Sequence, residues 1–538
     1  MNKDEKALEL LKAIGDIKDE YVEEASLDES ASDSSDNVVD FTKSTKKSYT
    51  SKKWAGLAVA ACLVLVVGFG VWKVSDIGTK DTASEMAETD NESEDIAHYD
   101  MADDVESNAE EFAGADSVAE EAESDDQAFK SFEKSRSANT LGLTDGIKES
   151  VEKDAVMSEE AAKNLTASSM KIFSEVVKNE EPGKNILISP TSILYAFGML
   201  ENGAKGDTLK ELEEAVNNGA TKDDLNAALH ALKNRLYADA SAKWNVANSL
   251  WIRDNDKVSV NKDFLSSVKQ YYGADVFKAP FDSTTLNDIN SWVNENTDQM
   301  IPAILQDIDS ESVMYLINAM CFKGEWLTQY EEAQIEKDAE FVGEDGAISN
   351  VNILRSDEDN YFTLGDGYGF VKEYRDSEYA FVGIEVSDEI SLDDYIMNIC
   401  KDPEAFRHAV DYNNLNYESN VIVRMPEFTY DYDKEFAPIL QGMGVNDAFD
   451  MNKADFTGIF DDSKPGDYSV GSVIHKTHIE VDRYGTKAAA ATAIAMVGNA
   501  MPSEEREIIE INLDHPFVYA IIDRQTNIPI FIGCVKNL

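Results

Sequence analysis

The sequence predicts an α+β fold for residues 155–538, because helix and strand patterns occur there without regular alternation. Apolar residues are spaced as on one face of a helix between Ala161 and Val177. Strand patterns occur at residues 245–252, 313–322, 380–386, 421–425 and 508–535. The residues before 155 have a different composition, which predicts three further segments.

Residues 54–73 are predicted to form a single transmembrane helix. Residues 55–71 carry no charge and are flanked by Trp54 and Trp72, and tryptophan is enriched at membrane interfaces. A helix of this length covers roughly 26–29 Å, which just spans a hydrocarbon core. The stretch Val59–Cys62 resembles a lipoprotein cleavage box, but the apolar run continues past Cys62, so lipidation is the lesser alternative.

Charges on either side of this helix predict that the N-terminus lies in the cytoplasm. Five lysines closely precede the helix, whereas Lys73 and Lys80 follow it among many acidic residues. By the positive-inside rule, residues 1–53 form a cytoplasmic segment and the rest of the chain is extracellular at the cell membrane. Residues 7–15 suit a short amphipathic helix, and this opening resembles cytoplasmic leaders of Gram-positive bacterial membrane proteins. The five lysines are Lys43, Lys46, Lys47, Lys52 and Lys53.

Residues 74–154 are predicted to be an acidic disordered stalk. They are rich in Glu, Asp, Ser and Ala and hold few large apolar side chains, too few to offset the entropy of ordering the chain. A coil of this length has an end-to-end distance of about 50 Å, and like charges extend it further. Whether the stalk is a spacer or a tolerated insertion stays open, as does shedding of the part beyond it.

Charge and motifs exclude several classes of function. The formal net charge of −56 disfavours binding to nucleic acid, whose phosphates such a surface repels. Motifs typical of hydrolases, zinc proteases and nucleotide-binding proteins do not occur, and His475 and His478 would point to opposite faces of a strand. No catalytic residue, metal site or cofactor is therefore predicted. The globular part has Cys321, Cys400 and Cys534, which we expect to be buried unpaired thiols.

The stretch from His475 to Gly498 carries the strongest functional signal. Its alternating character predicts a half-buried strand up to Asp482, and small neutral residues follow Gly485. Composition alone would make the alanine run a helix capped by Thr486. As a strand, the run would present an uncharged face, so it suits both an exposed loop and a strand inserted between two others. That face consists of Thr486, Ala488, Ala490, Thr492, Ile494 and Met496.

Two stretches near the C-terminus resemble signatures of the serpin family. Residues 485–492 are similar to the family's reactive-loop hinge, and residues 511–521 are similar to its C-terminal signature. Further landmarks in the family's order lie at residues 185–192, 289–297, 318–326, 424–428 and 443–449. The resemblance covers nearly all of residues 158–538. It implies the serpin fold, with three β-sheets, about nine helices and an exposed reactive-centre loop.

The resemblance also assigns roles to individual residues. Four of them would form the polar cluster beneath the opening of the sheet, which is called the shutter. Trp326 would lie at the breach, where insertion of the loop begins. The shutter residues are Ser189, Ser192, Asn318 and His475. The hinge residues are Gly485, Thr486, Lys487, Ala488, Ala489, Ala490, Ala491 and Thr492.

The chain departs from the family pattern close to these sites. Arg483 and Lys487 stand where the family usually has Glu, and Gln299–Met300 replace the Gly-Lys that usually follows its helix F. Lys487 falls on the solvent-tolerant face of the hinge, so insertion is expected to survive. Arg483 is less easily accommodated, because the family's Glu at this position pairs with a basic residue near the breach.

The resemblance implies suicide inhibition of serine, or also cysteine, endopeptidases. A protease would attack the loop, form an acyl-enzyme and be trapped when the freed loop inserts into the sheet. Hinge spacing places the scissile bond at Asn499–Ala500, whereas counting back from Pro516 gives Glu505–Arg506. Met496, Met501 and Arg506 remain alternative bait residues. The small neighbouring residues suit elastase-like or subtilisin-like enzymes.

The expected partner is thus a serine protease, held in a covalent acyl complex by a monomeric inhibitor. The rival interpretation is a non-inhibitory serpin that acts as a surface adhesin or carrier protein. Bulky or charged residues on the inserting face would favour that role. Thr486, Ala488 and Ala490 argue against it because they are small and uncharged.

Overall fold

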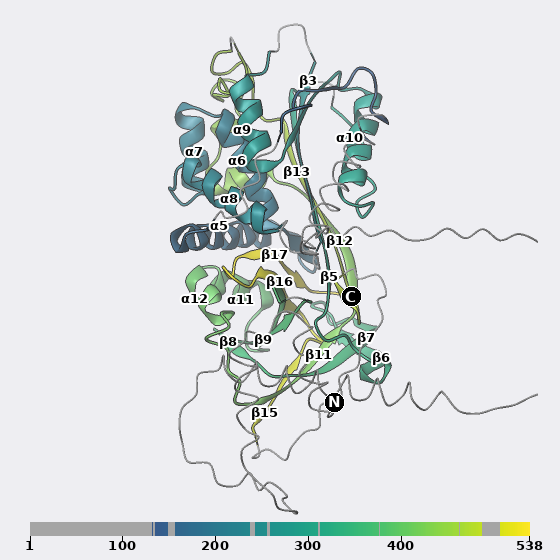
Figure 1. The fold of residues 1–538 in the computed structure, drawn as a ribbon. Helices are drawn as coiled ribbons and strands as arrows, with labels where there is room; N and C mark the ends of the chain where they lie inside the picture. Colours follow the sequence, from purple (N-terminus) through teal and green to yellow (C-terminus); the bar gives the residue numbers. More distant parts are fainter. Residues whose placement is uncertain are drawn as a thin grey trace, which may run out of the picture. The chain divides into compact units, whose positions relative to one another are not determined.

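The computed structural model describes residues 132, 135–148, 156–236, 243–254, 259–309, 312–375, 377–461, 463–486 and 506–538. This part of the chain forms nine α-helices and three β-sheets (Figure 1), which confirms the predicted α+β class. The predicted cytoplasmic segment, the span at 54–73, most of the stalk, hinge residues 487–492 and the Asn499–Ala500 bond lie outside it. Within the described ranges, no helix is long and apolar enough to cross a membrane.

The helices occur where apolar residues repeat at helical spacing, and several begin at a side-chain cap. Helix α5 follows Ser158, whose hydroxyl accepts a hydrogen bond from the N–H of Ala161, and the helix spans the predicted run from Ala161 to Val177. The helices are α5 (Glu159–Lys178), α6 (Pro190–Gly203), α7 (Gly206–Val216), α8 (Lys222–Leu236), α9 (Lys262–Tyr272), α10 (Ser283–Asn296), α11 (Leu392–Ile399), α12 (Pro403–Ala409) and α13 (Ala437–Met443). Two 3-10 turns are η2 (Glu332–Gln334) and η3 (Asp447–Phe449).

The strands fall on all five predicted stretches and form three sheets. The seven-stranded sheet, called the large sheet here, has the order β1 (Leu141–Gly142), β4 (Asp275–Ala279), β3 (Lys243–Arg253), β5 (Met314–Glu325), β14 (Gly485–Thr486), β13 (Ser472–Val481) and β12 (Phe428–Glu435). The six-stranded sheet has the order β2 (Ile186–Ile188), β17 (Pro529–Val535), β16 (Phe517–Asp523), β10 (Tyr379–Val386), β9 (Gly367–Glu373) and β8 (Phe362–Leu364). The four-stranded sheet has the order β15 (Ile508–Asn512), β11 (Asn420–Pro426), β7 (Ile348–Glu358) and β6 (Ile335–Val342).

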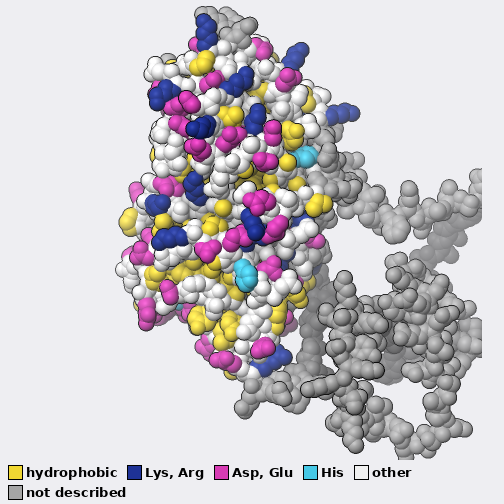
Figure 2. Space-filling view, turned by 90° about the vertical axis from the view of Figure 1, so that its left-hand side faces the viewer, with side chains coloured by type: hydrophobic (Ala, Val, Ile, Leu, Met, Phe, Trp, Pro, Cys, Tyr) yellow, Lys and Arg dark blue, Asp and Glu magenta, His cyan; other side chains and the backbone are white. Residues whose placement is uncertain are grey.

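Helices cover the large sheet on both faces. In Figure 1, α6 to α9 gather on one face and α10 lies alone on the other. The main core runs between the helices on the first face and the six-stranded sheet, whose strands β16 and β17 are buried throughout. A second, smaller core fills the space beneath α10 and includes Trp251, Phe277 and Trp292. The helical side of the domain carries acidic and basic side chains interspersed (Figure 2), so this face has no field of a single sign.

Cysteines in the described part follow the sequence-based expectation. Cys321, Cys400 and Cys534 form no disulfide within the described ranges; the first and last are fully buried and Cys400 is partly buried. Burial raises the pKa of the Cys534 thiol and that of Cys400, each to about 12. Both thiols are therefore kept protonated and unreactive.

Residues 135–148, called the strap here, fall within the range assigned to the stalk but pack on the domain. Strand β1 of the strap pairs antiparallel with the edge strand β4. The Asp288 carboxylate of α10 accepts hydrogen bonds from the Ser137 N–H at 3.0 Å, the Ser137 hydroxyl at 2.7 Å and the Thr140 hydroxyl at 2.6 Å. Just before the strap, Phe132 is buried against Trp251 and Phe277. The stalk range therefore extended too far, because these few apolar and polar contacts order the segment.

Replacing Asp288 with Ala should destabilise the intact protein. The substitution leaves the Ser137 and Thr140 donors without their charged acceptor, which costs roughly 1–3 kcal/mol. Thermal unfolding followed by circular dichroism measures the effect. Ser291→Ala, on the exposed side of the same helix, is the matched control and should leave Tm unchanged. An Asp288→Ala protein as stable as this control would mean that the strap adds nothing to the stability of the domain.

Candidate functional site

The site lies where two neighbouring strands of the large sheet part from each other. Strands β13 and β5 pair in parallel from Ser472–Tyr315 to Thr477–Met320, where their pairing ends. Further along, the two-residue strand β14 lies between them and runs antiparallel to both, with Thr486 opposite Gly324 on β5 and Val481 on β13. The sheet is thus already opened at one end by the first residues of a further strand.

A tight turn feeds β14 into this opening. The Asp482 carboxylate accepts hydrogen bonds from the backbone N–H groups of Tyr484, at 2.7 Å, and Gly485, at 3.1 Å, as aspartate commonly does in turns. A Cβ atom on Gly485 would lie 2.0 Å from the carbonyl oxygen of Gly324. Only glycine therefore allows the backbone of β14 to approach β5 so closely.

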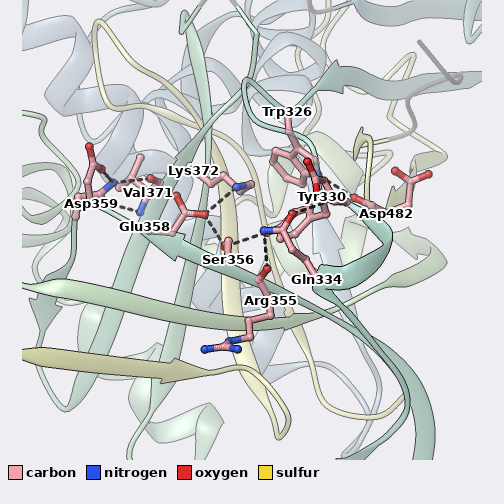
Figure 3. A network of polar contacts seen from close by, with 12 residues as sticks. Trp326, Tyr330, Gln334, Arg355, Ser356, Glu358, Asp359, Val371, Lys372 and Asp482 are labelled. Atoms are coloured by element: carbon pink, nitrogen blue, oxygen red, sulfur yellow. Dashed lines mark hydrogen bonds and ion pairs between the residues drawn. The ribbon is translucent and has the colours of Figure 1, made fainter. Parts of the chain in front are cut away.

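The first side chain beyond that glycine is buried. Thr486 is 1% exposed, and its hydroxyl is hydrogen-bonded to the Tyr374 hydroxyl at 2.5 Å. The Trp326 indole stacks on the Tyr374 ring, with the ring centroids 4.7 Å apart, and its Nε1 donates to the carbonyl oxygen of Asp482 (Figure 3). Gly485 and Thr486 thus lie inside the sheet, and Trp326 contacts the turn that leads into β14.

The four predicted shutter residues meet where β5 and β13 are still paired. The Asn318 side chain donates to the carbonyl oxygen of Ser192 at 2.7 Å and accepts from the Ser192 hydroxyl at 2.5 Å. His475, which is opposite Asn318 in the strand register, bonds to the Asn318 side-chain oxygen through Nδ1 at 3.0 Å. Ser189, the N-cap of α6, donates its backbone N–H to His475 Nε2 at 3.2 Å. The cluster therefore joins both strands to α6.

The hydrogen bonds fix the protonation state of His475. Because Nε2 accepts from the Ser189 N–H, the proton of the neutral ring must be on Nδ1, which donates to Asn318. Burial lowers the pKa of His475 from 6.5 to about 3, since a charged imidazole would lose water without gaining an anionic partner. His478 is on the opposite face and contacts Asp431 at 2.7 Å, so the two histidines do not converge on one site.

Arg483, which departs from the family pattern, has an acidic partner. Its guanidinium donates two hydrogen bonds to the Glu332 carboxylate in η2, one of them at 2.7 Å. Arg483 therefore pairs with an acidic residue of η2, so its charge has a partner in the folded protein. Lys337 and Arg483 together lower the pKa of Glu332, as cationic neighbours do for a carboxylate.

Sequence reasoning missed three residues of the site. Asn248 on β3 accepts a hydrogen bond from Asn318 at 2.6 Å, Tyr374 holds Thr486, and Glu332 holds Arg483. An Asn in the middle of the predicted strand at 245–252 was a usable signal for Asn248. Tyr374 and Glu332 gave no such signal, because their partners are distant in sequence. Among the alternative bait residues, Arg506 is exposed and directly precedes the stretch leading into β15.

This arrangement can accept more of the same segment, since β14 already runs between two separated strands. The sequence model of the protein family "Serpin (serine protease inhibitor)" matches residues 163–538. The chain belongs to the serpin family.

Within the described ranges, no group of three or more His, Cys, Asp or Glu side chains converges to hold a metal ion.

Relatives from distant organisms match the serpin domain over most of their own length. The leukocyte elastase inhibitor of Xenopus tropicalis is 30% identical over 387 residues, which cover 68% of this chain and 97% of the relative. A serpin-like protein of Methanosarcina mazei is 30% identical over 363 residues, which cover 66% of this chain and 81% of the relative. The relatives named as inhibitors of proteases support an inhibitory rather than a catalytic role for this serpin.

Solved serpin structures have the same fold. The thermophilic serpin tengpin in its native state has a TM-score of 0.68 at 35% identity, covering 74% of this chain and 100% of tengpin. Tengpin in its latent state gives a lower TM-score of 0.60 at 33% identity, covering 73% of this chain and 100% of tengpin. The structure of this serpin is therefore more similar to the native than to the latent form.

The buried neutral His475 predicts a stability that falls in mild acid. Its pKa is lower in the folded protein than in the unfolded chain, so the unfolded chain binds the extra proton between about pH 6.5 and pH 3. Between pH 7 and pH 5 this residue alone should remove about 2 kcal/mol of stability. Unfolding by urea at both pH values should show a smaller pH effect for His475→Gln than for the wild type.

His478→Gln is the matched control for this measurement, because it changes a histidine on the other face of the same strand. It leaves the hydrogen bonds of the shutter intact, so the contribution of His475 to the pH effect should remain. A wild-type pH effect in His475→Gln itself would contradict the assignment of a neutral, strand-joining His475.

Proposed function

We propose that this serpin inhibits serine endopeptidases by a suicide-substrate mechanism in which the loop between the hinge and β15 carries the bait residue. The observation that carries the proposal is the position of Gly485 and Thr486, which already lie between β5 and β13. Their burial means that the direction of insertion and the residue at which it starts are set before any protease binds.

The mechanism follows from the position of the loop in the chain. The protease serine oxygen attacks the scissile carbonyl, forms an ester, and the peptide bond breaks with its nitrogen leaving as a protonated amine. The new N-terminal half of the loop stays attached to the protease and is continuous with β14. Inhibition requires it to extend between β5 and β13 before water hydrolyses the ester.

Insertion exchanges hydrogen bonds within the large sheet. An entering strand antiparallel to both β5 and β13 must separate Asn318 from His475, which pair across these strands. The entering backbone offers each strand a full ladder of new hydrogen bonds in return. Insertion is therefore favourable overall, while the shutter sets a barrier that the intact loop does not cross.

The proposal also covers the target protease and the cellular location of the protein. Hinge spacing and small neighbours favour cleavage at Asn499–Ala500 by elastase-like or subtilisin-like enzymes. The charge pattern around residues 54–73 favours a cell-surface protein with its serpin domain extracellular. The opening segment, which resembles bacterial leaders, favours a bacterial protein, and we propose that the domain is monomeric. A serpin held at the surface in this way would protect the cell from proteases that reach it.

The direct test is incubation with pancreatic elastase and with subtilisin, followed by denaturing electrophoresis. An inhibitor gives a denaturant-stable band near the summed mass of serpin and protease, and mass spectrometry of the released C-terminal peptide identifies the cleaved bond. Cleavage by both enzymes without such a band would favour the surface adhesin or carrier role instead.

Replacing Thr486 with Arg should convert the inhibitor into a substrate. The Thr486 side chain is buried away from water, so a guanidinium there would be buried without a partner. Insertion would then be slower than hydrolysis of the ester. Residual protease activity, titrated against serpin concentration, measures the change. Ala489→Arg is the control, because Ala489 falls on the solvent-tolerant face, and it should keep inhibition. Full inhibition by Thr486→Arg would contradict the insertion step.

A further inference from the structure

A buried ion pair lies beneath the point where the hinge enters the sheet. Lys372 on β9 donates to the Glu358 carboxylate on β7 at 2.8 Å, with side-chain exposures of 5% and 14% (Figure 3). Ser356 donates to the same carboxylate oxygen at 2.6 Å. Burial by itself lowers the pKa of Lys372, but Glu358 and Tyr330 raise it overall, so the ammonium group stays charged. The pair thus joins the six-stranded sheet to the four-stranded sheet.

The Lys372 ammonium faces two aromatic rings. It lies 4.6 Å from the centroid of the Tyr330 ring and 5.9 Å from that of Trp326, within the range of cation–π attraction. Tyr374 directly follows the last residue of β9 and lies two residues after Lys372, so in extended backbone both side chains point to the same face. Tyr374 stacks on Trp326 from that face and holds Thr486.

The two rings belong to residues 326–330, called the receiving turn here, which binds the backbone of the hinge. The Trp326 Nε1 donates to the Asp482 carbonyl at 2.8 Å, and the Trp326 backbone N–H donates to that of Tyr484 at 2.9 Å. The Tyr330 N–H donates to the carbonyl of Arg483 at 3.0 Å. Three successive carbonyls before Gly485 are thus held by a turn whose aromatic rings contact Lys372.

We propose that the Lys372–Glu358 pair is a positioning element for loop insertion, which deepens the proposed function and rests on it. The pair orients Trp326 and Tyr330 so that the receiving turn holds residues 482–484 with Gly485 and Thr486 between β5 and β13. By fixing this start, the pair sets the rate at which the rest of a cleaved loop enters the sheet. An apolar pair of similar volume would fill the space, but it would not direct the ring faces.

The double variant Lys372→Leu/Glu358→Leu separates positioning from stability. Removing both charges leaves neither of them buried alone, and apolar replacement of a buried pair is often neutral for stability. Tm of the intact variant should therefore stay close to that of the wild type. Its insertion rate should fall about fivefold, the effect of losing a cation–π contact. Lys372→Arg, which keeps the cation, should restore most of the wild-type rate.

The insertion rate is measured without a trapped protease. Thermolysin, a metalloprotease, cleaves with an activated water and forms no acyl-enzyme, so it nicks the loop and is released. Intrinsic tryptophan fluorescence after rapid nicking then follows insertion. Lys453→Leu, which removes an exposed ion pair with Asp447, is the control and should insert at the wild-type rate. A folded double variant that inserts at the wild-type rate would overturn the proposal.

A second variant decides the question if the double variant does not fold. Tyr330→Leu keeps the ion pair and the backbone N–H that binds Arg483, but it removes the nearer ring face. It should slow insertion by a similar factor, and a wild-type rate would count against the positioning role. If the wild type inserts after nicking but traps no serine protease, the proposed inhibition fails, while the comparison of insertion rates still decides this inference.

Discussion

The structure depends on a parallel pairing of two strands that stops partway along their length. Strands β5 and β13 are joined from Ser472 to Thr477 and part beyond that point. At the centre of the joined region, Asn318 and His475 form a buried polar bridge to α6. Because buried polar groups must keep hydrogen-bond partners, this bridge breaks only when another strand supplies new ones. This requirement for new hydrogen-bond partners keeps β5 and β13 paired until a further strand enters between them.

The hinge residues Gly485 and Thr486 lie where β5 and β13 have already parted. Gly485 permits the close approach to β5, and Thr486 is held by Tyr374. The costly first step of strand addition is therefore complete in the intact protein. What remains is propagation, in which each added residue gains hydrogen bonds on both sides. In the proposed mechanism, a cut in the loop frees this process, and the receiving turn above the Lys372–Glu358 pair determines where it starts.

Much of the fold could be predicted from the sequence, since strand and helix periodicities are local. The alternation in β13, the glycine before Thr486 and the small residues after it are visible in order along the chain. Pairings between distant residues could not be found in this way. Arg483 with Glu332, Lys372 with Glu358 and the strap on Asp288 each join segments that only the folded sheets bring together.

The central claim is that the reactive-centre loop becomes a strand of the large sheet once it is cut. Thermal unfolding of the intact protein and of the protein nicked within residues 499–506 tests this most directly. If the loop completes the sheet, the nicked form gains a central strand and melts at a markedly higher temperature than the intact form. A nicked protein that melts at the same temperature as the intact one, or below it, would contradict the account.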